Sequence, residues 1–371
     1  MNRSAMKRRF AVLSLLLFVG TVCGSIADAR VFQQALPGYK FNFPADHASH
    51  DQFKTEWWYY TGHLNSTTAG RFGYELTFFR TGVDDPAISK TGWDVDNFYI
   101  AHFALSDETN HKFLFFEKMN RPGLKTADAS KDHYCVFNEN WSVEQLGDSF
   151  VLKADAPDIA LHLILKSLKP PVVHGVNGVS QKASCRGCAS HYYSLTHLQS
   201  QGVLNIHGKA LPVTGLSWMD HEFGSNQLTK EQVGWDWFSL QLDDNSELMI
   251  YLMRKTKGDL DANSSGSLVR ADGTVKHLTL ADFKIKATGS WKSPKTGGTY
   301  PMGWTVEIPS EKLTATVTPS FPDQELNTKK TSGVTYWEGT AAVDGTKDKR
   351  KVTGQAYVEM TGYAERFGKN I

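Results

Sequence analysis

The chain has 371 residues, with 40 lysines and arginines against 39 aspartates and glutamates, for a formal net charge of +1. This balance gives no support to nucleic-acid binding, which requires a basic face. After residue 29 no apolar run reaches the roughly 18 residues that a membrane-spanning helix needs. The 342 residues after position 29 of the 371 exceed the ~250–300 at which one hydrophobic core stops growing, so two domains are expected.

The first 29 residues have the pattern of a secretory signal peptide. A basic cluster at 7–9 leads into the apolar run 10–22, and residues 27–29 (ADA) form an A-x-A cleavage signature. Cys23 is a weaker alternative as a lipidated residue, because Gly20 stands where an aliphatic residue is required. We therefore expect cleavage after residue 29 and a periplasmic or secreted protein, by an undetermined export route. Its net charge would be −2, since the leader contains four of the 40 basic and one of the 39 acidic residues.

Three cysteines follow the leader, so at least one of them has no disulfide partner within the chain. Cys185 and Cys188 are spaced for a disulfide, a metal-binding knuckle or a redox pair, and Cys135 stands apart. In an oxidising compartment a local disulfide or two unpaired thiols is the favoured interpretation. A zinc site would need further ligands, for which His191 and His197 are the nearby candidates. We predict no metal and no other cofactor.

From residue 56 onward the hydrophobic pattern is that of short strands, and no well-capped amphipathic helix follows residue 38. Between residues 72 and 78 large apolar side chains alternate with Gly, Glu and Thr, the period of two expected for a half-buried strand. Further strands in the first half are predicted at 94–105, 149–154 and 159–165.

The second half continues in the same manner. Residues 235–242 and 248–253 flank the segment 243–246 (DDNS), which predicts a hairpin because Asp and Asn tolerate positive φ angles. This hairpin would bring Tyr251 close to Trp237. Many short strands with regular turns indicate a sandwich or barrel, and two units of about 150–190 residues fit the length. Further strands are predicted at 278–285, 303–308, 313–317, 334–343 and 354–360.

Four consecutive aromatic residues occupy positions 57–60. Alternate residues of a strand face opposite sides, so these side chains cannot all enter one core. Either Trp57 and Tyr59 or Trp58 and Tyr60 must line a second layer or a cavity. Ordinary aromatic packing is the simpler interpretation, and substrate contact by Trp57 and Trp58 is the functional one.

Arg80 ends the next predicted strand, and Tyr99, His102 and Asp107 follow on the strands after it. An arginine at the mouth of a barrel often ties loops to a carboxylate. The alternative is that Arg80 contacts the substrate.

The segment 190–194 (SHYYS) places a serine beside a histidine. This suggests nucleophilic catalysis only loosely, because the members of a catalytic triad meet in space and are rarely neighbours in sequence. The chain contains no G-x-S-x-G nucleophile elbow. A buried or rim pair of tyrosines is the simpler interpretation, with Tyr193 as a candidate substrate contact.

The stretch 215–224 (GLSWMDHEFG) combines two carboxylates and an imidazole near the middle of the chain. In an extended segment Asp220 and Glu222 share one face, and His221 points to the other. Burial among tryptophans would raise the pKa of a carboxyl group, as proton transfer at neutral pH requires, and aromatic faces stabilise cations. The alternative is that both carboxylates cap turns at a domain junction. The candidate catalytic residues are Asp220, His221 and Glu222, and the candidate substrate contacts nearby are Trp218, Trp235, Trp237 and Tyr251.

Ten short motifs follow one another along nearly the whole chain after the leader. They are PADHASH (44–50), EWWY (56–59), FGYELTFFR (72–80), AHFALSD (101–107), YYS (192–194), WMDHEFG (218–224), GWDWF (234–238), YP (300–301), YWEG (336–339) and GY (362–363). Together they resemble the AttH-like, hydroxyneurosporene synthase (carotenoid 1,2-hydratase) family, many of whose bacterial members are described only as predicted secreted hydrolases.

This resemblance implies an all-β fold of two consecutive lipocalin-like antiparallel β-barrel domains, at 30–223 and 224–371, with a pocket at or near their interface. It further implies an enzyme that acts without a cofactor on a hydrophobic small molecule, isoprenoid-, lipid- or polyketide-like. The implied reaction is hydration, cyclisation or hydrolysis.

The chain departs from the carotenoid hydratases at two positions. At the positions that match residues 220–223, those enzymes have the sequence Asp-His-Asn-Trp. Their histidine matches His221, whereas Phe223 replaces their tryptophan. Their proton-donating aspartate lies two residues beyond a tyrosine matched by Tyr251, at Met253. These departures argue against carotenoid hydration itself. They favour, as the alternative, a lipocalin-like carrier or scavenger that binds an apolar ligand without catalysis.

Overall fold

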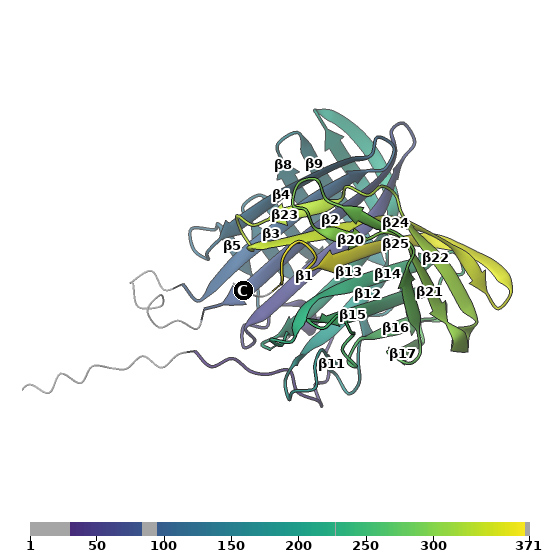
Figure 1. Ribbon diagram of the computed structural model, residues 1–371. Helices are drawn as coiled ribbons and strands as arrows, with labels where there is room; N and C mark the ends of the chain where they lie inside the picture. Colours follow the sequence, from purple (N-terminus) through teal and green to yellow (C-terminus); the bar gives the residue numbers. More distant parts are fainter. Residues whose placement is uncertain (1–29, 84–94, 227, 368–371) are drawn as a thin grey trace, which may run out of the picture.

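The computed structural model of the chain describes residues 30–83, 95–226 and 228–367 (Figure 1). The expected leader at 1–29 lies outside these ranges, as does residue 94, the first of one predicted strand. The described chain is built almost entirely of antiparallel strands in two large sheets. None of its helices is long and apolar enough to cross a membrane.

The first sheet has 13 strands, in the order β4-β3-β2-β1-β13-β12-β9-β8-β7-β6-β5, with β10 and β11 paired to β12. A short 3-10 helix, Ala45–His47, precedes it. The strands are β1 (Thr55–Ser66), β2 (Gly70–Gly82), β3 (Asn97–Asp107), β4 (Lys112–Asn120), β5 (Ala127–Ala129), β6 (Cys135–Asn138), β7 (Trp141–Leu146), β8 (Ser149–Ala156), β9 (Ile159–Ser167), β10 (Val172–Val173), β11 (Ser180–Gln181), β12 (Ala189–Ile206) and β13 (Lys209–Gly224).

The second sheet has 10 strands, in the order β17-β16-β15-β14-β25-β24-β22-β21-β18, with β23 paired to β24. Beside it lie a two-stranded sheet, β19 (Ser290–Lys292) with β20 (Thr299–Pro301), and a 3-10 helix, Pro309–Glu311. The strands are β14 (Gln232–Leu242), β15 (Glu247–Lys255), β16 (Ser265–Val269), β17 (Val275–Thr279), β18 (Lys284–Ala287), β21 (Trp304–Ile308), β22 (Leu313–Pro319), β23 (Glu325–Thr328), β24 (Val334–Lys347) and β25 (Arg350–Thr361).

Side-chain hydrogen bonds nearly close the first sheet into a barrel. Asn138 of β6 donates to the carbonyl of Tyr99 on β3 at 3.1 Å and accepts from Asn120 of β4 at 2.7 Å. These bonds join the two ends of the strand order, where no backbone ladder is present among the described strands. The predicted all-β fold with lipocalin-like barrels is confirmed.

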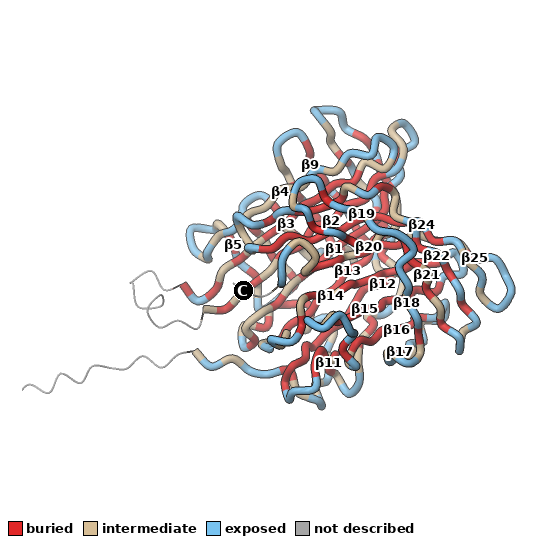
Figure 2. Tube along the Cα trace, viewed as in Figure 1, coloured by how far each residue is buried: buried red, intermediate tan, exposed pale blue. Residues whose placement is uncertain are grey.

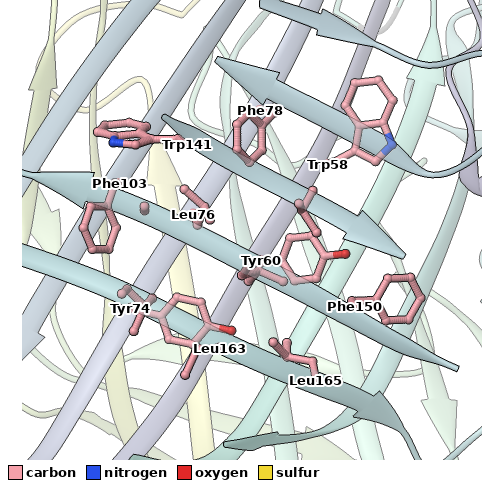
Figure 3. Close-up of a cluster of buried hydrophobic side chains, with 14 of the residues drawn as sticks. Trp58, Tyr60, Tyr74, Leu76, Phe78, Phe103, Trp141, Phe150, Leu163 and Leu165 are labelled. Carbon is pink, nitrogen blue, oxygen red and sulfur yellow. The ribbon is translucent and has the colours of Figure 1, made fainter. Parts of the chain in front are cut away.

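Large apolar side chains fill the interior of the first barrel, as Figure 3 shows. Trp58 and Tyr60 of β1 point into this core, together with Trp141 and Phe150 from strands later in the chain. The second sheet encloses a core of its own. The predicted split of the four aromatics is confirmed, because Tyr59 belongs instead to a cluster between the two sheets.

Both sheets contribute to this middle layer. Its buried apolar members are Tyr59, Tyr192, Trp218, Trp237, Met249, Tyr251, Met253 and Tyr357. Figure 2 shows burial concentrated where the sheets meet and exposure at the outer ends of the hairpins. The layer therefore forms a third core, made by the outer faces of β1, β12 and β13 against β14, β15 and β25.

Most predicted strands are present. Residues 72–78 lie in β2, and the hairpin of β14 and β15 pairs Trp237 with Tyr251 as expected. The single strand predicted at 278–285 is wrong. A turn interrupts it, because the Asp282 carboxylate accepts hydrogen bonds from the Thr279 backbone amide at 2.8 Å and hydroxyl at 2.7 Å.

A disulfide joins Cys185 to Cys188, which is one of the two states that the sequence favoured for this pair. Cys135 is a half-buried free thiol.

Candidate active site

Strand β13 separates two polar networks, because its side chains alternate between the barrel interior and the middle layer. Asp220 and Glu222 face the layer, whereas His221 faces the interior of the first barrel. The strand lies between β1 and β12, which place Tyr59 and Ser194 on either side of Asp220. The predicted division of these three residues between two faces is therefore confirmed.

Asp220 is a carboxyl group held by uncharged donors. The Tyr192 hydroxyl donates to its Oδ2 at 2.6 Å, and the indole of Trp218 donates to its Oδ1 at 2.6 Å. The hydroxyl of Ser194 also donates to Oδ1. Burial raises the pKa of Asp220 to about 7, and the three hydrogen bonds oppose this rise only in part. A carboxyl group of this kind exchanges its proton near neutral pH, as general acid–base catalysis requires.

The hydrogen bonds of Asp220 extend into the second sheet through Trp237 of β14. Its indole donates to the Tyr192 hydroxyl at 3.1 Å. Tyr59 and Trp218 both pack edge-to-face against Trp237, with ring centroids 5.4 Å and 6.1 Å away. Aromatic rings from both sheets therefore surround the carboxyl group and exclude water from it.

Ser194 is fixed from behind by His174. Its hydroxyl lies 2.6 Å from His174 Nε2, and His174 Nδ1 lies 2.9 Å from the hydroxyl of Ser267 on β16. Burial holds the pKa of His174 well below its usual value. This imidazole is therefore neutral and places no positive charge beside Asp220.

Glu222, in contrast, has a cationic partner. The ammonium of Lys182 lies 3.0 Å from its Oε1, and the Ser190 hydroxyl donates to the same oxygen. The ammonium also lies 4.0 Å from the ring centroid of Tyr251 and 4.9 Å from that of Tyr192. Burial lowers the pKa of Lys182, but Glu222, Tyr251 and Asp220 together outweigh this effect, and the pKa lies above its usual value. Glu222 thus forms an ion pair and differs chemically from Asp220.

A second group of carboxyls faces the layer, and sequence reasoning missed it. Glu75 of β2 and Glu338 of β24 are fully buried. Glu359 of β25 is the cross-strand neighbour of Glu338, and its Oε2 accepts from the indole of Trp235 at 3.0 Å. Burial raises the pKa of Glu75 to about 7 and that of Glu359 to about 8, and it raises the pKa of Glu338 well above its usual value.

Two signals in the sequence pointed toward this group. Glu75 is a charged residue on the alternate face of an apolar strand, and Glu338 lies in the YWEG motif. Neither signal showed that strands 260 residues apart in the chain would meet, as the hydrogen bond between Tyr336 and Glu75 demonstrates (|i−j| = 261).

The cavity between β1, β13, β14 and β25 has a volume of about 10 Å³, room for about one water molecule. A drug-sized ligand needs a pocket of roughly 300–1,000 Å³. A ligand of that size therefore does not fit this cavity, and it enters there only if the surrounding side chains move apart. The polar and aromatic residues that line the cavity are Thr61, His63, Trp218, Ser239, Gln241, Gln355 and Tyr357.

On the other face of β13, His221 belongs to an ionic network centred on Glu56. The Glu56 Oε1 lies 2.8 Å from His221 Nε2 and 2.9 Å from His50 Nδ1, and Oε2 accepts from Arg80 Nε at 3.1 Å. Burial raises the pKa of Glu56, but these partners outweigh it and hold the pKa well below its usual value. The pKa of His50 is raised to about 9: burial lowers it, but hydrogen bonds to Asp46 and Glu56 outweigh that effect. Arg80 also donates to two backbone carbonyls of the preceding loop, so it ties this loop to a carboxylate.

His50, Glu56 and His221 are also the one group of described residues whose donor atoms lie close enough together, within 4.8 Å, to hold a metal ion. Those atoms already hydrogen-bond one another, and Arg80 occupies the second oxygen of Glu56. The charges of Glu56 and Asp46 are balanced by His50 and Arg80. The network is complete as a protein-only ion cluster.

The predicted site residues thus separate into three groups. Asp220, Glu222, Trp218, Trp237 and Tyr251 meet in the middle layer. His221, Trp58, Arg80 and Tyr193 lie on the barrel side, where Tyr193 bridges His221 at 3.0 Å and His47 at 2.6 Å. Trp57 and Trp235 are half-buried at the margin of the layer.

A family model described as AttH-like matches residues 34–363 of the chain. The fold is similar to the crystal structure of a putative AttH from Nitrosomonas europaea, which is 33% identical, with a TM-score of 0.81 over 90% of this chain and 100% of that one. Kievitone hydratase from Nectria haematococca has the same fold at 14% identity, with a TM-score of 0.66 over 91% and 98% of the two chains. The dehydratase asqC of Emericella nidulans is 24% identical over 203 residues, so the match spans about half of each protein, 52% and 53%.

Proposed function

This chain belongs to the AttH-like family, and we propose that it is an exported enzyme that adds water to, or removes it from, a hydrophobic small molecule in the layer between its two sheets. The observation that carries the proposal is Asp220, a buried carboxyl group held by uncharged donors, with a pKa of about 7. Such a group can both donate and accept a proton at neutral pH without a cofactor.

The reaction class follows from this chemistry. Adding water to a double bond, or removing it, requires a proton to be delivered to carbon or taken from it, and Asp220 supplies the group that does so. The two relatives named for a reaction are a hydratase and a dehydratase. We therefore place hydration or dehydration ahead of cyclisation and hydrolysis.

The class of substrate follows from the walls of the layer. Around Asp220 these are the rings of Tyr59, Tyr192, Trp218 and Trp237, which bind apolar molecules. The side chains around the small cavity must move apart for such a molecule to enter there. The signal-peptide pattern at residues 1–29 supports a periplasmic or extracellular site of action.

The alternative is a carrier without catalysis, as in lipocalins that hold a ligand inside a barrel. Here the first interior is filled by large side chains, including Trp58, Tyr60 and Trp141, and Phe238 and Trp304 fill the second. A carrier would have to use the same middle layer, where Asp220 would serve no purpose. This packing favours the enzyme.

The proposal can be tested by incubating the purified protein with extracts that contain candidate substrates. The chain from residue 30 onward is incubated with lipid and isoprenoid extracts, and products that differ by one water are sought by mass spectrometry. Asp220→Asn should lower the rate by roughly 100-fold to 10,000-fold. Glu325→Gln is the matched control, because Glu325 is a buried carboxyl that accepts from the Tyr300 hydroxyl at 2.8 Å away from the Asp220 network. Equal product formation by all three proteins would remove the proposed chemistry.

A further inference from the structure

Glu75 and Glu338 are contributed by opposite sheets and lie in the same layer as Asp220. Both are fully buried, and no salt bridge among the described residues includes either of them. They interact electrostatically, since Glu75 raises the pKa of Glu338 after the larger effect of burial. A buried ionised carboxylate without a cation is strongly unfavourable, so below pH 7 the neutral form predominates in both groups.

The hydrogen bonds show which oxygen of each group carries the proton. Glu75 Oε1 accepts from the hydroxyls of Thr77 at 2.7 Å and Tyr336 at 3.2 Å. Glu338 Oε1 accepts from the Tyr59 hydroxyl. An oxygen that already accepts from hydroxyls serves as the carbonyl oxygen of a neutral acid, which leaves the O–H on Oε2. Among the described residues, Oε2 of both glutamates has no hydrogen-bond partner.

A third unused donor lies beside them. The hydroxyl of Tyr357 on β25 is buried without a partner, and burial raises its pKa, as do the neighbouring Glu338 and Glu75. Tyr357 also lines the small cavity, together with Thr61, whose Oγ1 is likewise unpartnered. Unsatisfied buried polar groups are rare in native proteins and call for a partner that the folded chain does not supply.

Among the described residues, the groups that contact the two glutamates supply no cation. His63, whose ring centroid lies 6.1 Å from that of Tyr357, faces the Glu108 carboxylate, with Nδ1 3.5 Å from its Oε1. His102 lies behind Tyr336, with Nδ1 2.7 Å from its hydroxyl, and burial lowers the pKa of His102 to about 3. Tyr59 and Tyr336 donate to the glutamates and remain protonated, since burial raises the pKa of both hydroxyls well above the usual value. Glu359 completes the cluster as a further carboxyl of raised pKa.

We propose that the free oxygens of Glu75, Glu338 and Tyr357 form a donor site for the carbonyl oxygen of the substrate. The substrate is therefore a conjugated carbonyl compound or, in the reverse direction, the corresponding β-hydroxy carbonyl compound. This inference rests on the proposed function and names its substrate class. Neutral carboxyl and phenol groups in an apolar site are strong donors to an oxygen on which negative charge develops. Such charge develops when water adds to, or leaves, the double bond next to a carbonyl.

The chemistry balances without a further reactant. The oxygen of water bonds to the carbon β to the carbonyl, and the α carbon takes the proton of the Asp220 carboxyl. The proton that water releases then restores this carboxyl. One molecule of water is added, nothing is oxidised, and the reverse sequence removes water.

The test uses trans-4-phenylbut-3-en-2-one, a conjugated ketone whose absorption moves to longer wavelength when its carbonyl accepts strong hydrogen bonds. With the wild-type protein below pH 7 we expect saturable binding and a red shift of the bound probe. The hydrocarbon trans-1-phenylpropene, which has no carbonyl, should bind at least roughly tenfold more weakly. The red shift should fade as the pH rises through the pKa of Glu75, about 7.

Two variants locate the donors. Glu338→Met and Tyr357→Phe should each weaken binding of the ketone roughly fivefold to tenfold and reduce the red shift, while Glu325→Gln should do neither. Circular dichroism and thermal melts establish whether each variant is folded. If Glu338→Met does not fold, Tyr357→Phe still decides the test. Equal binding without a red shift in all proteins, or no saturable binding because the oxygens hold water only, would overturn the inference. A red-shifted bound ketone without turnover would support the donor site and count against the proposed function.

Discussion

The hydroxyl of Tyr59 on β1 donates a hydrogen bond to Glu338 on β24 and so joins the first sheet to the second. Tyr59 is also the cross-strand neighbour of Asp220. One residue thus lies between the two groups of carboxyls, with Asp220 beside it and Glu338 at its tip. The proposed proton donor and the proposed carbonyl site are for this reason within reach of a single small molecule.

Removing this hydroxyl should weaken the layer. Tyr59→Phe leaves Glu338 Oε1 without its donor, so the free energy of unfolding should fall by about 1–3 kcal/mol, measured by urea denaturation. Tyr134→Phe is the control, because its hydroxyl bonds Tyr60 at 2.6 Å within one barrel. Both variants should lose stability, but only Tyr59→Phe should also reduce binding of the conjugated ketone. A fall in binding in both would show that stability alone controls it.

The raised pKa of Asp220 predicts that the folded protein loses stability as the pH rises from 4 to 7. Its pKa is raised by burial from a usual value of 3.8 to about 7, so the folded protein holds a proton that the unfolded chain has released between these values. Stability from this group is therefore full below pH 4 and declines up to about pH 7. Asp220→Asn does not titrate. The stability of wild type relative to this variant should thus fall by up to about 1.4 kcal/mol per pH unit across that window.

Urea denaturation at several pH values measures this difference between the two proteins. Taking the difference cancels the histidines, which are common to both. A relative stability that does not change between pH 4 and 7 would show that Asp220 is ionised in the folded protein.

Asp220 and His221 should respond differently to substitution, since they face opposite sides of β13. Asp220→Asn should lower turnover roughly 100-fold to 10,000-fold at little cost in stability. His221→Gln removes an imidazole packed between Glu56 and Tyr193, so it should lower stability by about 1–3 kcal/mol and leave turnover largely intact in the folded fraction. Enzyme assays paired with denaturant melts compare the two. Loss of turnover at full stability in His221→Gln would assign the histidine a direct part in the reaction.

Removing only one partner of the ion pair between Lys182 and Glu222 should strongly lower the free energy of unfolding. Lys182→Met leaves a buried carboxylate without a cation, and unfolding should become easier by about 3–5 kcal/mol. Adding Glu222→Gln to Lys182→Met should restore much of this loss. The exposed pair of Lys312 and Asp348 provides the contrast, because water screens its charges and Lys312→Met should leave stability nearly unchanged. Similar losses at both pairs would mean that Lys182 is accessible to water.

The disulfide between Cys185 and Cys188 closes a loop of sequence separation 3. Loop-closure entropy for so short a loop is about 2 kcal/mol, so a reducing agent should lower the unfolding free energy by no more than this. Cys135→Ser should respond to the reductant as wild type does, and Cys185→Ser with Cys188→Ser should not respond at all. A larger loss on reduction would indicate that the loop at 182–188 supports the layer through Lys182.

Local pattern was sufficient for much of the fold. Alternation in β2 and the turn residues between β14 and β15 predicted strands where strands are found, because side-chain period and turn chemistry are properties of a few neighbouring residues. The strand predicted at 278–285 was wrong for a related reason. Its apolar residues continue the strand pattern, while a single side chain, Asp282, turns the backbone.

For the candidate site, the sequence by itself determined that Asp220 and Glu222 would share a face apart from His221, since a strand allows no other arrangement. Only the tertiary structure decided that Glu222 pairs directly with the ammonium of Lys182 while Asp220 accepts hydrogen bonds from uncharged donors, because Lys182 arrives from a distant loop. It alone brought Glu75 against Glu338, from strands of different sheets. Whether a carboxyl group is buried and whether it has a cationic partner depend on the residues that pack against it. Those residues come from parts of the chain that are far away in sequence.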